Sequence, residues 1–192
     1  MRILIAVPTY EYIHPDTALS ILKMGMVSFQ HFDFSVHVHS HSLIHEARNA
    51  IVKKCLDEKY DYLFFLDSDV IFQDTLLLYL LQLNKEIIGG LYFRKRHPFD
   101  PLITKFDGKE YQPMYEYPKN STFEVDSIAM GCTLIKREVL EKMKDPHFWY
   151  EILPSGQHLG EDTYFCRKAT ELGYKIWCSS YTPVYHIGRQ LV

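Results

Sequence analysis

The stretch of sequence that decides the fold reads Tyr62-Leu63-Phe64-Phe65-Leu66-Asp67-Ser68-Asp69. A continuous apolar run bounded by polar residues is typical of a central parallel strand, because helices cover both faces of such a strand. The acidic triplet follows directly, so it falls at the carboxyl end of the strand. Ligands of open α/β sheets bind at that end. The stretch therefore predicts a buried strand over 62–66 and a polar site just beyond it.

Strand and helix patterns alternate along the chain on both sides of this stretch. Short apolar runs predict strands over 3–7, 34–41 and 86–92, and apolar residues at helical spacing predict helices over 17–29, 46–56 and 75–83. In the first helix the residues with this spacing are Leu19, Leu22, Met26 and Phe29. The alternation predicts right-handed βαβ units, and therefore an α/β fold with a mostly parallel central sheet flanked by helices.

The pattern changes after residue 93. Residues 94–122 are rich in proline, tyrosine and charges and have weak periodicity, so we predict a long excursion with one hairpin, a small antiparallel β element. The other predicted elements are two β segments around Gly131 within 123–135, a helix over 137–144, a loop over 145–160, a helix over 161–172 and a last strand over 175–179. A chain of 192 residues without a linker or repeat predicts a single domain, 1–192.

The composition excludes several classes of protein. Hydrophobic residues make up 47% of the chain and charged residues 23%, which are the values of an ordinary globular domain. The 21 Lys and Arg against 24 Asp and Glu leave a net charge of −3, so we expect no nucleic-acid partner. One basic cluster, Arg94-Lys95-Arg96-His97, could contact a small anion such as a diphosphate.

Cysteine usage and hydropathy indicate the compartment. The four cysteines form no Cys-x-x-Cys pair, so we predict reduced, buried thiols at Cys55, Cys132, Cys166 and Cys178. The first apolar run is too short for a secretory leader, and no other run reaches the length of a membrane span. We therefore expect a cytoplasmic protein with no membrane span.

The triplet over 67–69 is a candidate metal site. Asp67 and Asp69 repel each other unless water or a shared cation separates them. Mg²⁺ and Mn²⁺ prefer carboxylate oxygens, usually together with substrate phosphates. The alternative is a polar turn that caps the next helix. His186, which follows the last predicted strand, could add an imidazole ligand or have a purely structural role.

Glu161 and Asp162 begin a predicted helix behind a glycine-containing loop. The helix dipole favours an ionised carboxylate at this end, as a general base requires, although simple charge complementarity explains the pair equally well. Arg48, near the start of its helix, could bind an anion or form an ordinary solvated ion pair.

Histidines also recur along one predicted strand. His37, His39 and His41 share a face, because side chains two residues apart in a strand point the same way. They could bind zinc. The alternative is a polar strand face, which the lack of a nearby acidic partner favours.

Seven short segments stand in a fixed order along the chain. They are Ile5-Ala6-Val7-Pro8-Thr9-Tyr10, Ala47-Arg48-Asn49, residues 60–69, Ile88-Gly89-Gly90-Leu91-Tyr92, Met130-Gly131, Gly160-Glu161-Asp162 and His186-Ile187-Gly188. In these segments the chain resembles, nearly end to end, small GT-A-fold glycosyltransferases of the family-2-like, Asp-x-Asp type that use nucleoside-diphospho-sugars. The resemblance implies a single-domain GT-A (Rossmann-like) fold, with a nucleotide-binding half over 1–93 and a donor and acceptor half over 94–192.

The resemblance also implies roles for individual residues. The donor would be bound by Pro8, Thr9, Tyr10, Arg48, Asp67, Ser68, Gly90 and Gly131. Mn²⁺, or Mg²⁺, would bridge the two donor phosphates and would be held by Asp67, Asp69 and His186. Asp162, with Glu161 beside it, would be the catalytic base that deprotonates the acceptor hydroxyl. Direct displacement with a single base predicts inversion at the anomeric carbon.

Two departures from the family pattern leave the substrates open. Met130-Gly131-Cys132 stands where relatives have Gly-x-Gly, so the donor sugar is undetermined, with a UDP-sugar as the first expectation. The chain ends six residues after His186, so we expect a glycan or other hydroxyl acceptor that is small, binds 94–122, or is presented by another domain of a larger protein.

Two other functions remain as alternatives. A sugar-phosphate nucleotidyltransferase shares the architecture, but it would normally carry a glycine- and arginine-rich signature after the first strand, where this chain has Tyr10-Glu11-Tyr12-Ile13-His14. A non-catalytic sugar-nucleotide or glycan-binding module is the other alternative.

Overall fold

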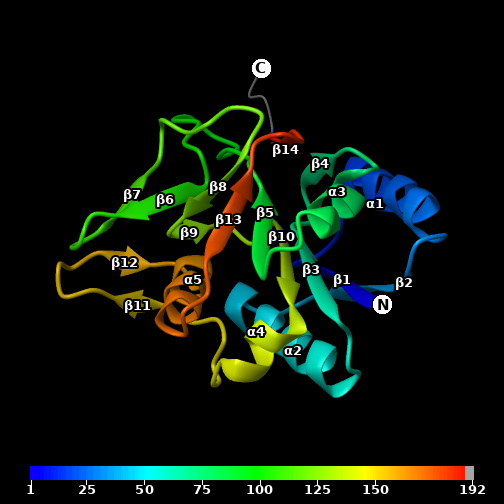
Figure 1. The fold of residues 1–192 in the computed structure, drawn as a ribbon, viewed down its shortest axis with the longest axis horizontal. Coiled ribbons are helices and arrows are strands. Elements are labelled where there is room, and N and C mark those ends of the chain that lie inside the picture. Colours follow the sequence, from blue (N-terminus) through cyan, green and yellow to red (C-terminus); the bar gives the residue numbers. More distant parts are fainter. Residues whose placement is uncertain (189–192) are drawn as a thin grey trace.

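A computed structural model describes residues 1–188 of the chain (Figure 1). A seven-stranded central sheet organises it, in the order β2-β1-β3-β10-β5-β13-β8. Its strands are β1 (Arg2–Pro8), β2 (Asp33–His39), β3 (Tyr62–Leu66), β5 (Ile87–Gly90), β8 (Thr122–Val125), β10 (Cys132–Lys136) and β13 (Ile176–Ser179). β2, β1, β3, β5 and β13 run in one direction, whereas β10 and β8 run in the other. The predicted α/β fold with a mostly parallel sheet is therefore confirmed.

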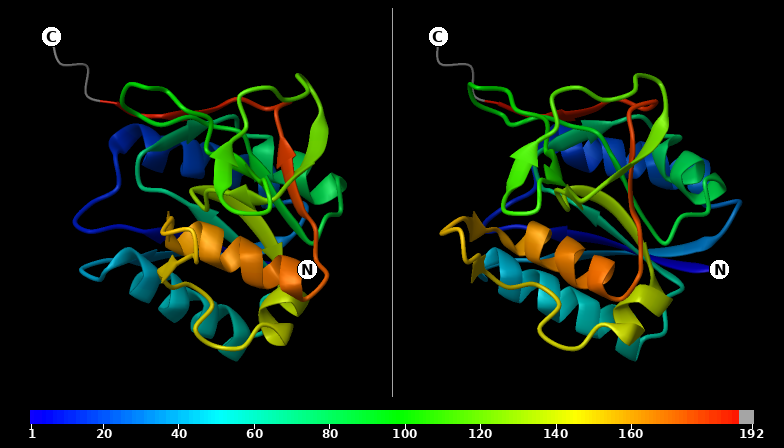
Figure 2. Two further views of the ribbon diagram at one scale, coloured as in Figure 1. Left: turned by 90° about the vertical axis from the view of Figure 1, so that its left-hand side faces the viewer. Right: turned by 60° about the vertical axis from the view of Figure 1, so that its left-hand side comes forward.

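Helices cover both faces of the sheet, as Figure 2 shows from two sides. α1 (Pro15–Ser28) and α3 (Leu76–Gln82) lie on one face, and α2 (Ile44–Asp57), α4 (Arg137–Lys142) and α5 (Glu161–Glu171) lie on the other. The strand predicted over 62–66 sits between the two layers. Leu63 and Phe65 join the core on the α2 side, and Phe64 and Leu66 join the core on the α1 side.

Strand β10 links the two halves of the chain. It inserts between β3 and β5, antiparallel to both, so that Leu134 lies opposite both Phe64 and Ile88. The segment predicted as two β pieces around Gly131 thus contributes a central strand. Because β8, β10 and β13 all come from the second half, the halves over 1–93 and 94–192 share one sheet.

Three small antiparallel elements surround this sheet. The excursion contains the predicted hairpin, formed by β6 (Ile103–Phe106) and β7 (Tyr111–Pro113), and β9 (Ser127–Ile128) pairs with β6. The prediction of a loop over 145–160 is wrong in part, because β11 (Glu151–Ile152) and β12 (His158–Leu159) form a hairpin there. The backbone closes this pair with turn residues that include Gly156, at φ 91°.

The last predicted strand, over 175–179, is not the last one. A further strand, β14 (Val184–His186), pairs with β4 (Val70–Phe72), which directly follows the acidic triplet. In this register His186 lies opposite Val70. A pairing of two three-residue strands far apart in the chain leaves no local periodicity, so the sequence pattern did not reveal it. It carries the histidine to the end of β3.

The buried face of α1 differs from the one that carries the apolar spacing. Ser20, Ile21 and Met24 are buried, whereas Leu22, Met26 and Phe29 are 61%, 67% and 64% exposed. The helix itself is confirmed, with Pro15 in its first turn. Ile21 and Met24 therefore pack on the sheet beside the small Ser20, whereas the apolar side chains of Leu22, Met26 and Phe29 point outward.

The state of the cysteines matches a further expectation. All four cysteines are buried and free, as predicted. Burial raises the pKa of Cys55, Cys132 and Cys166 to about 12, which keeps these thiols protonated. Within residues 1–188 no helix has the length and apolar character needed to cross a bilayer.

Candidate functional site

A cavity of about 530 Å³ opens at the carboxyl ends of β1 and β3. Its lining includes Pro8, Thr9 and Tyr10 at the end of β1, Arg48 on α2, Asp67, Ser68 and Asp69 after β3, Tyr92 and Lys95 after β5, and Glu161 and Asp162 at the start of α5. A second cavity of about 890 Å³ shares Thr9, Tyr10, Ser68, Asp69 and Lys95 with it. Two adjoining cavities therefore lie where the sequence predicts a polar site, just beyond the strand over 62–66.

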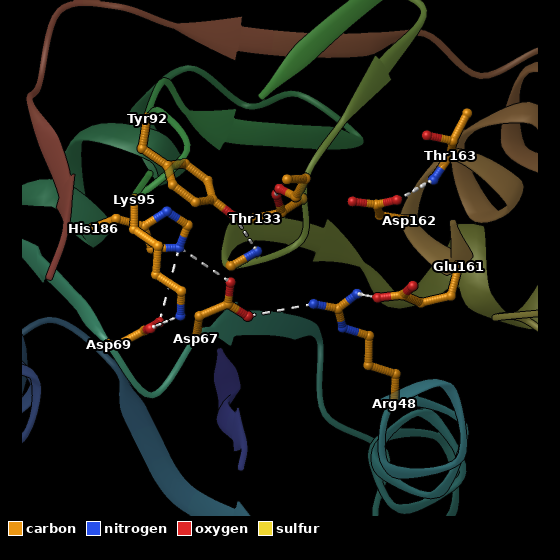
Figure 3. A network of polar contacts seen from close by, with 12 residues as sticks. Arg48, Asp67, Asp69, Tyr92, Lys95, Thr133, Glu161, Asp162, Thr163 and His186 are labelled. Carbon is orange, nitrogen blue, oxygen red and sulfur yellow. Dashed lines mark hydrogen bonds and ion pairs between the residues drawn. The ribbon is translucent and has the colours of Figure 1, made fainter. Parts of the chain in front are cut away.

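Asp67, Asp69 and His186 converge at the rim of this cavity (Figure 3). The Nε2 atom of His186 lies 3.8 Å from a carboxylate oxygen of Asp67 and 3.8 Å from one of Asp69. One ligand atom from each of the three residues lies within 4.8 Å of the others. Among residues 1–188 this is the one group of three or more such side chains that could hold a metal ion.

His186 is oriented by its second ring nitrogen. Nδ1 lies 2.7 Å from the carbonyl oxygen of Phe93. Because a carbonyl oxygen only accepts, Nδ1–H donates, and Nε2 is the nitrogen that faces the carboxylates. Metal-ligating histidines are commonly held in this way, with the far nitrogen bonded to a carbonyl or carboxylate.

Opposite charges shift the pKa values in this cluster. Burial lowers the pKa of His186, but the nearby carboxylate of Asp67, the hydrogen bond to the Phe93 carbonyl and the charge of Asp69 raise it above its ordinary value. Burial raises the pKa of Asp67, yet the nearby imidazole of His186 and the charge of Arg48 outweigh it, so that this pKa is lowered. Asp67 therefore stays ionised at neutral pH, and the cluster attracts positive charge.

Lys95 brings a cation to the same carboxylates. Its ammonium group forms an ion pair with Asp69. The carboxylates of Asp67 and Asp69 and the Nε2 atom of His186 form a set of oxygen and imidazole donors that suits Mn²⁺. The residues present thus fit the divalent ion that the resemblance implies.

Arg48 joins the two acidic pairs of the cavity. It is 4% exposed; one terminal nitrogen lies 3.3 Å from Asp67, and the other forms an ion pair with Glu161. Burial lowers the pKa of Arg48, and the charges of Asp67 and Glu161 raise it, with a net rise. Figure 3 shows the guanidinium between the two carboxylates. The guanidinium is a buried counter-charge for both carboxylates. The alternative of an ordinary, solvated ion pair of Arg48 is therefore wrong.

Asp162 lies on the side of the cavity formed by α5. The backbone N–H of Thr163 donates to its Oδ1 at 2.7 Å. Burial, and then the neighbouring charge of Glu161, raise the pKa of Asp162 from 3.8 to about 6. The helix N-terminus was expected to hold this carboxylate firmly ionised, but desolvation outweighs the helix dipole. At pH 7 the group is still mostly ionised, and it is basic enough to accept a proton.

The two glycines assigned to donor binding make room for protein atoms. A Cβ at Gly131 would lie 2.0 Å from Oδ2 of Asp67, so only glycine leaves space for this carboxylate. The Gly131 carbonyl accepts from the Asp67 N–H at 2.9 Å, and its N–H donates to the Tyr92 hydroxyl at 2.8 Å. A Cβ at Gly90 would lie 2.7 Å from Val184. Neither glycine is among the residues that line the cavity.

Two residues of the site had no specific role assigned from the sequence. Tyr92 is 1% exposed, and burial, followed by the charge of Asp67, holds its pKa well above 10, so the hydroxyl stays protonated beside Gly131. Lys95 belongs to the basic cluster that was expected to meet a small anion, and it lines the cavity next to Asp69. In the sequence, Lys95 could have been recognised as a site residue because its basic cluster follows closely after a strand, β5, which ends at Gly90.

The alternating histidines stay apart from this site. His37 and His39 share one face of β2, with ring centroids 6.0 Å apart. Neither belongs to a group of three potential metal ligands among the described residues. The polar-face interpretation agrees with this arrangement.

Comparisons with known proteins identify the fold. No family model matches the chain, and no curated protein matches it in sequence. Among solved structures, A197 from STIV superposes with a TM-score of 0.67 at 21% identity, over 97% of this chain and 86% of that one. GalNAc-T7, solved with UDP, GalNAc and Mn²⁺, superposes with a TM-score of 0.54 at 12% identity, over 99% of this chain but 44% of its own.

Sugar nucleotidyltransferases share the same architecture. UDP-glucose pyrophosphorylase, solved with UDP-glucose, superposes with a TM-score of 0.52 at 8% identity, over 96% of this chain and 93% of that one. The chain therefore has the Rossmann-like α/β fold that GT-A glycosyltransferases and sugar nucleotidyltransferases have in common. Identities this low establish the fold alone.

Proposed function

We propose that the protein is an inverting, metal-dependent glycosyltransferase that moves a sugar from a nucleoside-diphospho-sugar to a hydroxyl acceptor. One observation carries the proposal: two carboxylates of a metal-ligand cluster, Asp67 and Asp69, and a separate basic carboxylate, Asp162, line a single cavity at the switch-point edge of the sheet, with His186, the third possible ligand, beside the first two. The first can hold the diphosphate of a donor, and the second can take the proton of an acceptor. The two tasks are what direct sugar transfer requires.

The donor lies along the cavity from β1 to β5 in this proposal. Pro8, Thr9 and Tyr10 line the nucleoside end, within the half over 1–93. Asp67, Asp69 and His186 hold Mn²⁺ or Mg²⁺, which supplies Lewis-acid stabilisation of the departing diphosphate when bound. The Lys95 ammonium turns from Asp69 to the phosphates and adds positive charge there.

Asp162 acts on the acceptor in this proposal. Its carboxylate takes the hydroxyl proton as the acceptor oxygen bonds to the anomeric carbon and the bond from that carbon to the diphosphate oxygen breaks. A pKa of about 6 lets it accept the proton near neutral pH. Attack from the face opposite the leaving group inverts the anomeric configuration. Glu161 is a positioning residue, because it is tied to Arg48 and raises the basicity of Asp162 by its charge.

Arg48 positions the metal-binding carboxylates relative to the residues around the base in this proposal. It contacts Asp67 and Glu161 at once, so its guanidinium fixes the spacing between the metal-binding end of the cavity and the base. The guanidinium of a buried arginine suits such a role, because it is rigid and can contact two carboxylates at once. Arg48 also lines the cavity, where the resemblance implies that it contacts the donor.

Sugar-phosphate nucleotidyl transfer is the second candidate function. The superposition on UDP-glucose pyrophosphorylase over 93% of that chain favours it as strongly as the fold favours sugar transfer. Against it stand the lack of a glycine- and arginine-rich segment after β1 and the presence of Asp162, a base for which nucleotidyl transfer to a phosphate has no need.

Thermal denaturation with UDP and Mn²⁺ tests donor binding. A 100-fold excess of UDP over its Kd is expected to raise Tm by roughly 5–10 °C with Mn²⁺ present, and by much less with EDTA. Asp74→Asn removes an exposed carboxylate outside the cavity and should retain the full shift. GDP, ADP, CDP and TDP are tested in parallel. If no nucleoside diphosphate shifts Tm with or without metal, the proposal fails.

A further inference from the structure

We propose that the protein is a symmetric dimer in which two copies of β2 pair antiparallel, centred on Val36, to join their sheets. The proposal starts from the edge of the central sheet. β2 is the first strand in the sheet order, so one of its sides has no neighbour in residues 1–188 (Figure 1). Such an edge is a template for pairing with another chain.

The free edge lacks three of the features that usually prevent such pairing. Edge strands are commonly protected by lysine, by proline, or by a bulge. β2 contains no lysine and no proline, and its register with β1 is unbroken from Asp33 to His39. A regular seven-residue edge is thus open to a partner strand.

Backbone directions fix which residues can pair. The N–H of Asp33 and the carbonyl of His39 bond toward β1, to Met1 and Thr9. Because these groups alternate along a strand, the N–H and carbonyl groups of Phe34, Val36 and Val38 point to the free side. An antiparallel partner in which Val36 faces Val36 places all three residues in hydrogen-bonded positions, with about six bonds between the copies.

The same register is complementary in its side chains. Phe34 of one copy lies opposite Val38 of the other, and Asp33 lies opposite His39. The first contact is an aromatic and β-branched pair, and the second joins a carboxylate to an imidazole that can donate to it. The strand sequence from 33 to 39 is therefore complementary to itself when reversed, which an isologous two-fold interface requires.

An apolar groove beside the strand extends this interface. Ala18, Leu22, Met26 and Phe29 of α1, together with Phe34 and Val36 of β2, border a groove of about 500 Å³. A two-fold axis perpendicular to the joined sheet leaves both α1 helices on one face, so these stripes meet across the axis. Contiguous exposed apolar surface of this kind is uncommon on a protein that stays monomeric.

The charge around the groove favours a second copy over a membrane. Residues 15–39 contain one lysine, Lys23, and no arginine. An amphipathic helix that binds anionic lipid usually carries several basic residues on its polar face. The groove lies apart from the cavity described above, and no residue lines both.

Sedimentation velocity of the full chain tests the oligomeric state. We expect the wild type to sediment as a dimer at 10–100 µM, because these concentrations exceed a dimer dissociation constant on the order of 1 µM. Val36→Lys places a charge at the two-fold axis and should give a monomer with an unchanged Tm at low protein concentration. The matched control is Ile152→Lys, which charges another exposed apolar position, on the β11–β12 hairpin, and should stay dimeric. A monomeric wild type overturns the proposal, and so does a Val36→Lys variant that remains a dimer.

A cysteine cross-link tests the register independently of stability. Facing residues in a hydrogen-bonded antiparallel pair have Cα atoms about 5.5 Å apart, which a disulfide spans. Mild oxidation of Val36→Cys should give a covalent dimer, whereas Ile152→Cys should stay monomeric. Background is low because the four native cysteines are buried. A Val36→Cys chain that cross-links no better than Ile152→Cys overturns the pairing. So does a monomer that binds phosphatidylcholine vesicles and loses that binding on Met26→Lys, because the groove is then a membrane surface.

Discussion

The two acidic pairs of the cavity are chemically alike in sequence but differ in their surroundings. Asp67 and Asp69 face two cations and an imidazole: Arg48, Lys95 and His186. Glu161 and Asp162 share a single cation, and it contacts Glu161. The pKa of Asp67 is therefore lowered, and that of Asp162 is raised to about 6.

The difference shows how one cavity can hold carboxylates for opposite purposes. Surrounding positive charge keeps Asp67 ionised, so the first pair is suited to bind a cation. Burial beside an anion makes Asp162 basic, so it is suited to accept a proton. Arg48 is the element common to both pairs, because it neutralises one carboxylate of each. The predictions below change one pair at a time.

Asp162→Asn is expected to have the largest effect. Asparagine keeps the shape of the side chain but cannot accept the acceptor's proton, so turnover should fall by about 10²–10⁴-fold. The pair at β3 is untouched, so binding of UDP with Mn²⁺ should not change. Steady-state kinetics and calorimetry on one preparation measure both. If turnover persists at the wild-type level, Asp162 is not the base.

Asp69→Asn breaks the other pair. The loss of one carboxylate ligand should weaken Mn²⁺ binding by roughly 10–100-fold. The metal-dependent part of UDP affinity should fall with it. Calorimetric titration with Mn²⁺, and then with UDP, measures the change. The control Asp74→Asn removes an exposed carboxylate that does not line the cavity. Equal Mn²⁺ affinity in the two variants would contradict the assignment of the cluster.

Arg48→Met removes the element that the pairs share. The side chain is buried, so Asp67 and Glu161 each lose a partner without gaining water, and the free energy of unfolding should fall by about 3–5 kcal/mol. Urea denaturation measures this loss. Should the variant not fold, Arg48→Lys retains the charge without the two-pronged contact, and a smaller loss is expected. If the Arg48→Lys variant has the same free energy of unfolding as the wild type, simultaneous contact with the two carboxylates is dispensable.

The pH dependence of stability sharpens the contrast further. Because the pKa of Asp162 is about 6 in the folded chain and near 3.8 when unfolded, the folded state binds this proton more tightly. The group's contribution to stability therefore falls as pH rises from about 4 to 6 and stays low above that. Asp162→Asn has no such proton, so it should exceed wild type by up to about 3 kcal/mol at pH 8 and match it at pH 3.5. A difference independent of pH would contradict the raised pKa.

Local patterns predicted the part of the site that lies next to strong secondary-structure signals. The apolar run over 62–66 is β3 to the residue, so the triplet after it was placed at the sheet edge correctly. Glu161 and Asp162 do begin a helix, α5. In each case the residues that form the element and the residues of the site are neighbours in the chain, and periodicity reports on neighbours.

The contacts that give these residues their chemistry are long-range, and no local signal predicts them. Arg48 and Glu161 are separated by 113 positions, and Lys95 and Asp69 by 26. The raised pKa of Asp162 comes from burial, which depends on the whole fold. The exposed stripe on α1 was equally hidden, since helical spacing shows that a helix has an apolar face but does not show what covers that face.

Product analysis tests the central claim most directly. The protein is incubated with Mn²⁺ and nucleoside-diphospho-sugars in one series, and with nucleoside triphosphates and sugar 1-phosphates in the other, and ³¹P NMR follows the phosphorus. We predict release of a nucleoside diphosphate from at least one donor sugar, and its loss in Asp162→Asn. Formation of pyrophosphate in the second series, with no nucleoside diphosphate in the first, would contradict sugar transfer and assign the cavity to nucleotidyl transfer.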